Sequence, residues 1–80
     1  MTRDEIRTQI SGALTSVAPE IDPASLTPSA PLRDQVDLDS MDFLRFIVEL
    51  HTRLGIDVPE ADYAKLTSLD AIADYIAGGR

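Results

Sequence analysis

The sequence LDSMDFLRFIVELHTRLG, residues 38–55, decides the fold. Asp39 is a favourable residue to precede a helix, and Gly55 is a favourable residue to end one. The sequence therefore predicts a helix over residues 40–54. One stripe of this helix is apolar and should face a core. The stripe consists of Phe43, Ile47, Leu50 and Leu54, with Phe46 at its edge.

The same helix carries a second apolar group, which lies about 100 to 160° around the helix from the first. Its members are Met41, Leu44 and Val48. A central helix that is buried on two sides would explain such a pattern, and so would an exposed hydrophobic patch that binds a partner. The local sequence leaves both explanations open. We expect the remaining face to be in solvent.

Two further long helices and one short helix are predicted. Thr2 and Glu5 have the spacing of a capping box, and the helix that they begin should end at Pro19. Its apolar face is Ile6, Ile10, Ala13, Leu14 and Val17. The last helix should begin near Thr67 or Ser68 and end at the glycines Gly78 and Gly79, with Leu69, Ile72, Ala73 and Ile76 on one face. A short helical turn is expected near residues 60–64.

Residues 19–39 predict a long loop, because they contain four of the five prolines and show no helical or strand period. Ile21, Leu26, Leu32 and Val36 should hold this loop to the core. Loops of such length inside compact domains are commonly functional or disordered. The predicted fold is therefore all-α, a small bundle of three longer helices plus one short helix with a long loop between the first two long helices. We expect residues 1–80 to form one domain.

Size and composition exclude several classes of function. A chain of 80 residues has a thin core, which makes a large enclosed active site difficult to build. The chain has no cysteine, hence no disulfide and no thiolate nucleophile. Its formal charge of -7 should repel nucleic acid and anionic membranes. With no apolar signal core and no run of membrane-spanning length, we expect a cytoplasmic monomer that binds neither nucleic acid nor membrane.

Ser40 stands between Asp39 and Asp42 at the predicted start of the central helix. By the local sequence alone this group is best explained as a helix cap. A serine hydrolase is excluded, because the only histidine, His51, would lie about 16 Å away along the same helix. The aspartates near Ser40, including Asp37, lack the spacing of an EF-hand, so no metal site is expected.

The segment LDSMDFLRFIVELHTRLGIDVPEADYAKLTSLDAIADYI, residues 38–76, resembles the acyl carrier protein family. The resemblance includes the Asp-Ser pair at the helix start, the Gly-Ile-Asp-Val-Pro-Glu passage, Lys-Leu-Thr and the closing Asp-Tyr-Ile. It implies that Ser40 is the attachment point of 4'-phosphopantetheine and that Asp39 belongs to the motif. A phosphopantetheinyl transferase would use coenzyme A to modify Ser40, and the thiol of the arm would then carry an acyl group as a thioester.

The resemblance also implies roles for other residues. Those expected to contact partner enzymes are Met41, Asp42, Leu44 and Val48. Those expected to line an acyl pocket are Phe43, Phe46, Ile47, Leu50, Val58 and Leu66. Because Phe43 and Phe46 are bulky, our hypothesis is that they shorten this pocket and favour short acyl or aminoacyl cargo.

Two departures from the family bear on specificity. The central helix has as many basic as acidic side chains, whereas the fatty-acid carrier is typically strongly acidic there. The sequence Leu-Asp-Ser-Met also resembles D-alanyl carrier proteins. We therefore expect a non-catalytic acyl carrier of a specialised fatty-acid, polyketide or related pathway that works with acyl-loading and acyl-processing enzymes. The alternative is an aminoacyl, peptidyl or D-alanyl carrier, and a distant one is an unmodified helical adaptor.

Overall fold

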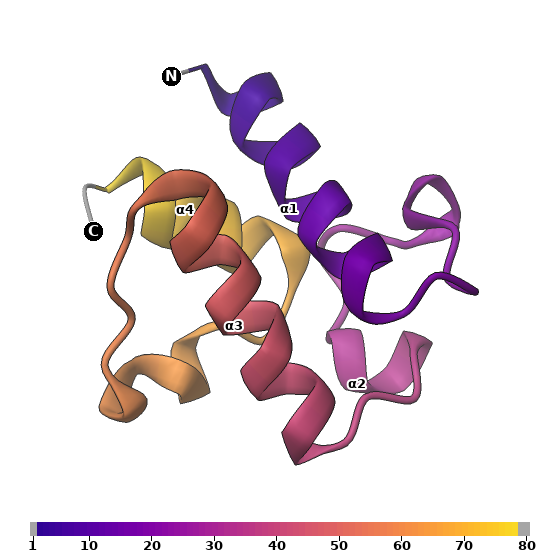
Figure 1. The fold of residues 1–80 in the computed structure, drawn as a ribbon. Coiled ribbons are helices and arrows are strands. Elements are labelled where there is room, and N and C mark those ends of the chain that lie inside the picture. Colours follow the sequence, from indigo (N-terminus) through magenta and orange to yellow (C-terminus); the bar gives the residue numbers. More distant parts are fainter. Residues whose placement is uncertain (1, 79–80) are drawn as a thin grey trace.

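The computed structural model describes residues 2–78, which form helices and loops without strands. The three long helices are α1 (Arg3–Val17), α3 (Ser40–Leu54) and α4 (Leu69–Ala77). Three short helical segments lie between them: η1 (Pro23–Ser25), α2 (Leu32–Gln35) and η2 (Glu60–Lys65). Figure 1 shows the long helices packed together, with α2 near the end at which α3 begins and η2 on the other side of that end. The predicted all-α bundle is confirmed.

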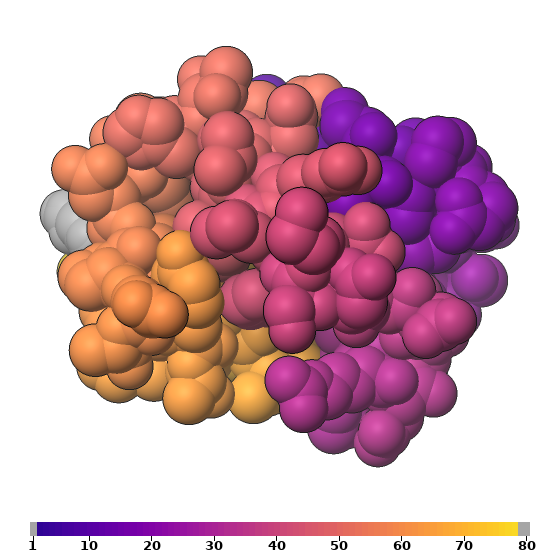
Figure 2. Space-filling model, turned by 60° about the horizontal axis from the view of Figure 1, so that its bottom comes forward, coloured from indigo at the N-terminus to yellow at the C-terminus, as the bar shows by residue number. Residues whose placement is uncertain are grey.

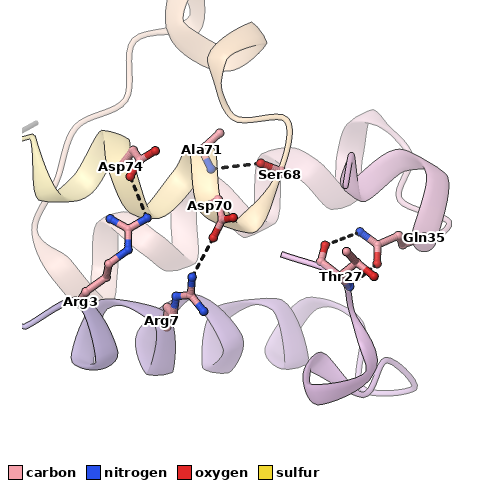
Figure 3. A network of polar contacts seen from close by, with 8 residues as sticks. All are labelled: Arg3, Arg7, Thr27, Gln35, Ser68, Asp70, Ala71 and Asp74. Carbon is pink, nitrogen blue, oxygen red and sulfur yellow. Dashed lines mark hydrogen bonds and ion pairs between the residues drawn. The ribbon is translucent and has the colours of Figure 1, made fainter. Parts of the chain in front are cut away.

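Each long helix begins at a polar side chain that accepts a hydrogen bond from the first turn. The Thr2 hydroxyl oxygen accepts from the Glu5 amide at 3.1 Å, and the Glu5 carboxylate accepts from the Thr2 amide at 2.7 Å, so the predicted capping box forms. Ser68 caps α4 by accepting from the Ala71 amide at 3.1 Å (Figure 3). These bonds satisfy amides that have no partner within their own helix.

The sequence predicts that glycines end the central helix and the last helix. Gly55 follows α3 with a φ of 68°, in the left-handed conformation that glycine adopts without a steric penalty. Gly78 follows α4. Gly79 lies outside the described residues. Within residues 2–78 no helix combines the length and the apolar character needed to cross a bilayer.

The core contains the apolar faces predicted for the long helices. Its buried members are Ile6, Ile10, Ala13, Leu14, Leu32, Phe46, Ile47, Leu50, Leu66, Ile72 and Ala73. Phe46 differs from its predicted place at the edge of the stripe, because it is fully buried, whereas Phe43 is only partly buried. A ring at the edge of an apolar stripe is long enough to reach into the core, which a helical projection of backbone positions does not capture.

The segment between α1 and α3 is more regular than the sequence predicts. It contains η1 and α2, which are too short to produce a detectable hydrophobic period. Two backbone hydrogen bonds attach the segment to the start of α4: the Leu32 amide donates to the Thr67 carbonyl at 2.8 Å, and the Asp70 amide donates to the Pro28 carbonyl at 3.0 Å. These bonds hold α2 and the residues before it against the start of α4.

Gln35 closes this segment with hydrogen bonds from its side chain. The Thr27 amide donates to Gln35 Oε1 at 2.6 Å, and Gln35 Nε2 donates to the Thr27 carbonyl at 2.9 Å (Figure 3). The Gln35 side-chain amide thus forms hydrogen bonds with both the backbone N–H and the backbone C=O of Thr27, which lies outside any helix.

Two ion pairs connect α1 with α4. Arg3 lies 2.7 Å from Asp74, and Arg7 lies 2.8 Å from Asp70 (Figure 3). Their order shows that the two helices run antiparallel. All four side chains are substantially exposed, so each pair contributes about 0.2–1 kcal/mol and the buried apolar side chains between the helices dominate.

Candidate cofactor-attachment site

Ser40 is the first residue of α3, and its side chain is exposed. The cap of this helix is Asp39, whose Oδ1 accepts from the Asp42 amide at 2.8 Å. The Phe43 amide donates to the Asp39 carbonyl at 2.9 Å. Within residues 2–78 the Ser40 hydroxyl has no hydrogen-bond partner. The hydroxyl is therefore free for another role, and Asp39 performs the capping.

The start of α3 is also favourable for a phosphate. The first amides of any α-helix have no partner within the helix, and Asp39 takes only that of Asp42, which leaves those of Ser40 and Met41 available. The aligned peptide dipoles give this end of the helix a partial positive charge. An exposed hydroxyl with free amides beside it fits a phosphoester of the kind that links phosphopantetheine to serine.

An open groove of about 1160 Å³ begins at Ser40 and runs between α3, α2 and η2. Figure 2 views the molecule from this side, with η2 in orange on one side of the groove and α2 and the start of α3 in magenta on the other. The groove is lined by Pro31, Leu32, Arg33, Leu38, Asp39, Ser40, Phe43, Leu44, Glu60, Tyr63, Ala64, Leu66 and Thr67. Ser40 thus opens onto a surface that is largely apolar.

Two aromatic side chains meet in this groove. The rings of Phe43 on α3 and Tyr63 on η2 are 5.7 Å apart at an interplanar angle of 75°, an edge-to-face contact. Phe43 also contacts the fully buried Phe46, with ring centroids 6.3 Å apart. Each such pair contributes about 0.5–1.5 kcal/mol beyond its buried area. The contact holds η2 against the first turn of α3.

Asp62 attaches the other side of η2 to α4. The Tyr75 hydroxyl donates to Asp62 Oδ2 at 2.7 Å, and Lys65 lies 3.1 Å from Asp62 Oδ1. The Tyr75 hydrogen bond, with a smaller effect from that of Lys65, lowers the pKa of the Asp62 carboxyl below its ordinary value. The carboxylate is therefore the form that holds η2 in place.

The structure brings two of the six residues predicted for the acyl pocket to the groove. Phe43 and Leu66 line it. The other four do not: Phe46, Ile47 and Leu50 are buried in the core, and Val58 is partly buried elsewhere against the core. Whether an acyl chain reaches them remains a prediction.

Several lining residues were missed by the sequence analysis. Tyr63 could have been suggested as the one aromatic residue of the predicted short helix. Leu32 was predicted to hold the loop, but neither it nor Arg33 carries a local signal for this groove, because α2 reaches the groove through the hydrogen bond between Leu32 and Thr67.

The second apolar group of α3 is exposed rather than buried against another helix. Met41 is 62% exposed, Leu44 47% and Val48 55%. Arg45 lies among them on the helix surface and makes no ion pair within residues 2–78, whereas Asp42 is partly buried. Exposed apolar side chains of this size on one helix face are typical of a protein-binding surface. Partner contact at these residues stays a prediction.

The only histidine lies at the end of α3 that is remote from Ser40. His51 is exposed at the far end of the helix, where its Nδ1 lies 2.8 Å from the Ile56 carbonyl and 3.1 Å from Asp57. Among the residues that the structure describes, no group of three or more histidine, cysteine, aspartate or glutamate side chains could hold a metal ion.

Comparison with known proteins gives a consistent result. The family model described as "Phosphopantetheine attachment site" matches residues 6–76. An acyl carrier protein of Rubrobacter xylanophilus is 30% identical over 76 residues, which cover 95% of this chain and 93% of that protein. An acyl carrier protein of Thermosynechococcus vestitus is 25% identical, with coverage of 95% and 93%.

A third relative is longer than this chain. The meromycolate extension acyl carrier protein of Mycobacterium leprae is 28% identical over 95% of this chain, and the match spans 65% of that protein's length. The chain belongs to the acyl carrier protein family, whose cofactor is a covalently attached 4'-phosphopantetheine.

Proposed function

We propose that this chain carries acyl intermediates on 4'-phosphopantetheine attached to Ser40 and presents them to partner enzymes. The observation that carries the proposal is the Ser40 hydroxyl, which is exposed, without a hydrogen bond and within the matched residues. The cofactor supplies a terminal thiol that holds acyl groups as thioesters, so a chain without cysteine can perform this function.

The chain itself supplies a rigid attachment point. Asp39 caps the start of α3, and the amides of Ser40 and Met41, which have no partner within the helix, would be available to the phosphate. No side chain of residues 2–78 is hydrogen-bonded to the Ser40 hydroxyl as a base. In the loading reaction, Ser40 Oγ bonds to the phosphorus that bears pantetheine, and adenosine bisphosphate is the leaving group. The transferase must therefore accept the proton of the Ser40 hydroxyl.

Partner enzymes would bind the surface formed by Met41, Leu44 and Val48, which lies beside the attachment point. A flexible tether at this place raises the local concentration of cargo at a docked active site. The same surface would serve an unmodified adaptor, and this is the observation that favours the second candidate function. We propose a specialised fatty-acid, polyketide or related pathway for the carrier, and no catalysis by the chain itself.

The two candidates differ in what they require of Ser40. We would incubate the native chain, Ser40→Ala and Ser29→Ala with coenzyme A, magnesium and a broad-specificity phosphopantetheinyl transferase, and record intact masses. Ser29 is an exposed loop serine and is the matched control. The proposal predicts one added phosphopantetheine on the native chain and on Ser29→Ala, and none on a folded Ser40→Ala. No gain on the native chain would favour the adaptor.

A further inference from the structure

Two aromatic rings meet in the groove that begins at Ser40, and the buried core residues Leu32 and Leu66 line the groove beside them. Phe43 projects from the first turn of α3 and Tyr63 from η2, and their rings meet edge to face at 5.7 Å. Both residues line the groove. Any group that is tethered at Ser40 and extends between α3 and η2 meets this pair.

Both rings of the pair are packed against the hydrophobic core. Phe43 contacts Phe46, and Phe46, Leu50 and Ile72 are fully buried. A chain that passes the pair must therefore separate well-packed side chains, which protein interiors resist because they are close-packed. The groove offers open volume, whereas the core does not.

Moving either ring out of the Phe43–Tyr63 contact costs free energy. Tyr63 belongs to η2, which the hydrogen bond between Asp62 and Tyr75 attaches to α4. Both rings are partly buried against the core, so moving either ring into water exposes apolar area. A short alkyl chain buries less area than the two rings would expose, so it gains nothing by displacing them.

We infer that Phe43 and Tyr63 form a barrier that confines cargo to the open groove, so that this chain shelters short acyl groups and excludes long alkyl chains from its core. The inference rests on the proposed attachment at Ser40. It assigns the barrier to Tyr63 together with Phe43, in place of the pair Phe43 and Phe46 expected from the sequence.

The absence of cysteine provides a test that needs no transferase. Ser40→Cys can be alkylated at one position with N-alkyl iodoacetamides of increasing length, namely ethyl, butyl, octyl and dodecyl. Each adduct is prepared with the native pair, with Tyr63→Ala and with the control Tyr63→Phe, which keeps the ring. The measurements are the melting temperature and the NMR contacts between the alkyl chain and the methyl groups of Leu50 and Ile72.

With the native pair and with Tyr63→Phe, we expect no rise in melting temperature beyond butyl and no alkyl contacts to Ile72. With Tyr63→Ala, we expect octyl to melt roughly 4 to 8 °C above butyl and to contact Ile72. Octyl or dodecyl contacts to Ile72 with the native pair would overturn the inference, even if Tyr63→Ala failed to fold. Equal behaviour of native and Tyr63→Ala adducts would also overturn it.

The alkylation test does not depend on whether Ser40 accepts phosphopantetheine. If Ser40 did not accept phosphopantetheine, the native chain would gain no mass in the transferase reaction. If the barrier were absent, the alkylated adducts would show contacts with the core whatever the transferase did. The two failures are therefore seen in different experiments.

Discussion

At the scale of single residues, Asp62 joins two parts of the molecule through one carboxyl group. It accepts from Tyr75 on α4, and its neighbour Tyr63 contacts Phe43 on α3. The hydrogen bond from Tyr75 lowers the pKa of Asp62. A carboxyl whose pKa is lower in the folded than in the unfolded state stabilises the fold above the unfolded pKa, and this stabilisation is lost as pH falls through the folded pKa.

We therefore predict that Asp62→Asn flattens the dependence of stability on pH below about pH 4, the ordinary pKa of an aspartate. Tyr75→Phe should flatten the same part of the profile, because it removes the hydrogen bond that lowers the pKa. Urea midpoints measured from neutral to acid pH would check this prediction.

Glu5→Gln is a suitable comparison for this experiment. The Thr2 amide lowers the pKa of Glu5, so this carboxyl acts in the same direction at a different place. Its effect should add to that of Asp62→Asn, since the two groups share no partner. If Asp62→Asn left the acid limb of the profile unchanged, the hydrogen bond with Tyr75 would not hold η2.

At the scale of the element, α3 presents a surface with balanced charge. Its exposed apolar side chains surround Arg45, which makes no ion pair among the described residues. Association rates follow the local electrostatic field rather than the net charge of -7. Arg45 should therefore weaken attraction to any partner with a basic docking surface.

We predict that Arg45→Glu raises kcat/KM for a transferase whose docking surface is basic, and that Arg45→Gln has a smaller effect in the same direction. The increase should decline as salt is added, because screening removes steering between exposed charges. Loading rates at several ionic strengths would test this. Equal rates for all three side chains would show that α3 does not face the transferase.

The contact between α1 and α3 gives a second prediction at this scale. Arg53 on α3 lies across Gly12 on α1, so that a Cβ on Gly12 would come within 2.7 Å of Arg53 Nη1. The same guanidinium group lies 3.4 Å from Gln9 and from Ser16. Alanine is favoured over glycine inside a helix by about 1 kcal/mol, but here it must displace these weak contacts.

We expect Gly12→Ala to stabilise the chain by about 1 kcal/mol when Arg53 is replaced by methionine, and by less in the native background. Urea unfolding of the two single variants and the double variant measures the difference. The same gain in unfolding free energy in both backgrounds would mean that the Arg53 side chain moves away from the added methyl group at no cost in stability.

At the scale of the whole molecule, the long helices could be predicted from sequence because each has a local pattern. Asp39 and Gly55 mark the ends of α3, and the capping box of Thr2 marks the start of α1. Ser40 could be proposed as the attachment point from sequence because its motif is also local. The exposure of Met41, Leu44 and Val48 could not be decided, since a helical pattern does not say how many sides of a helix are covered.

The groove could not be predicted, because segments far apart in the sequence create it. The Tyr63 ring contacts the Phe43 ring, and the Thr67 carbonyl accepts a hydrogen bond from the Leu32 amide. No periodic sequence pattern predicts either contact. The helix α2 is a single turn and has no detectable period. Sequence patterns thus indicated Ser40 as the attachment point, which stays a prediction, whereas the groove beside it depends on tertiary contacts.

The most direct measurement of the central claim is the mass of one tryptic peptide after loading with coenzyme A and transferase. Cleavage after Arg33 and Arg45 releases DQVDLDSMDFLR, residues 34–45, in which Ser40 is the only hydroxyl-bearing residue. The account predicts that this peptide, and no other, gains one phosphopantetheine. A gain on a different peptide, or an unmodified peptide 34–45 in a loaded chain, would contradict it.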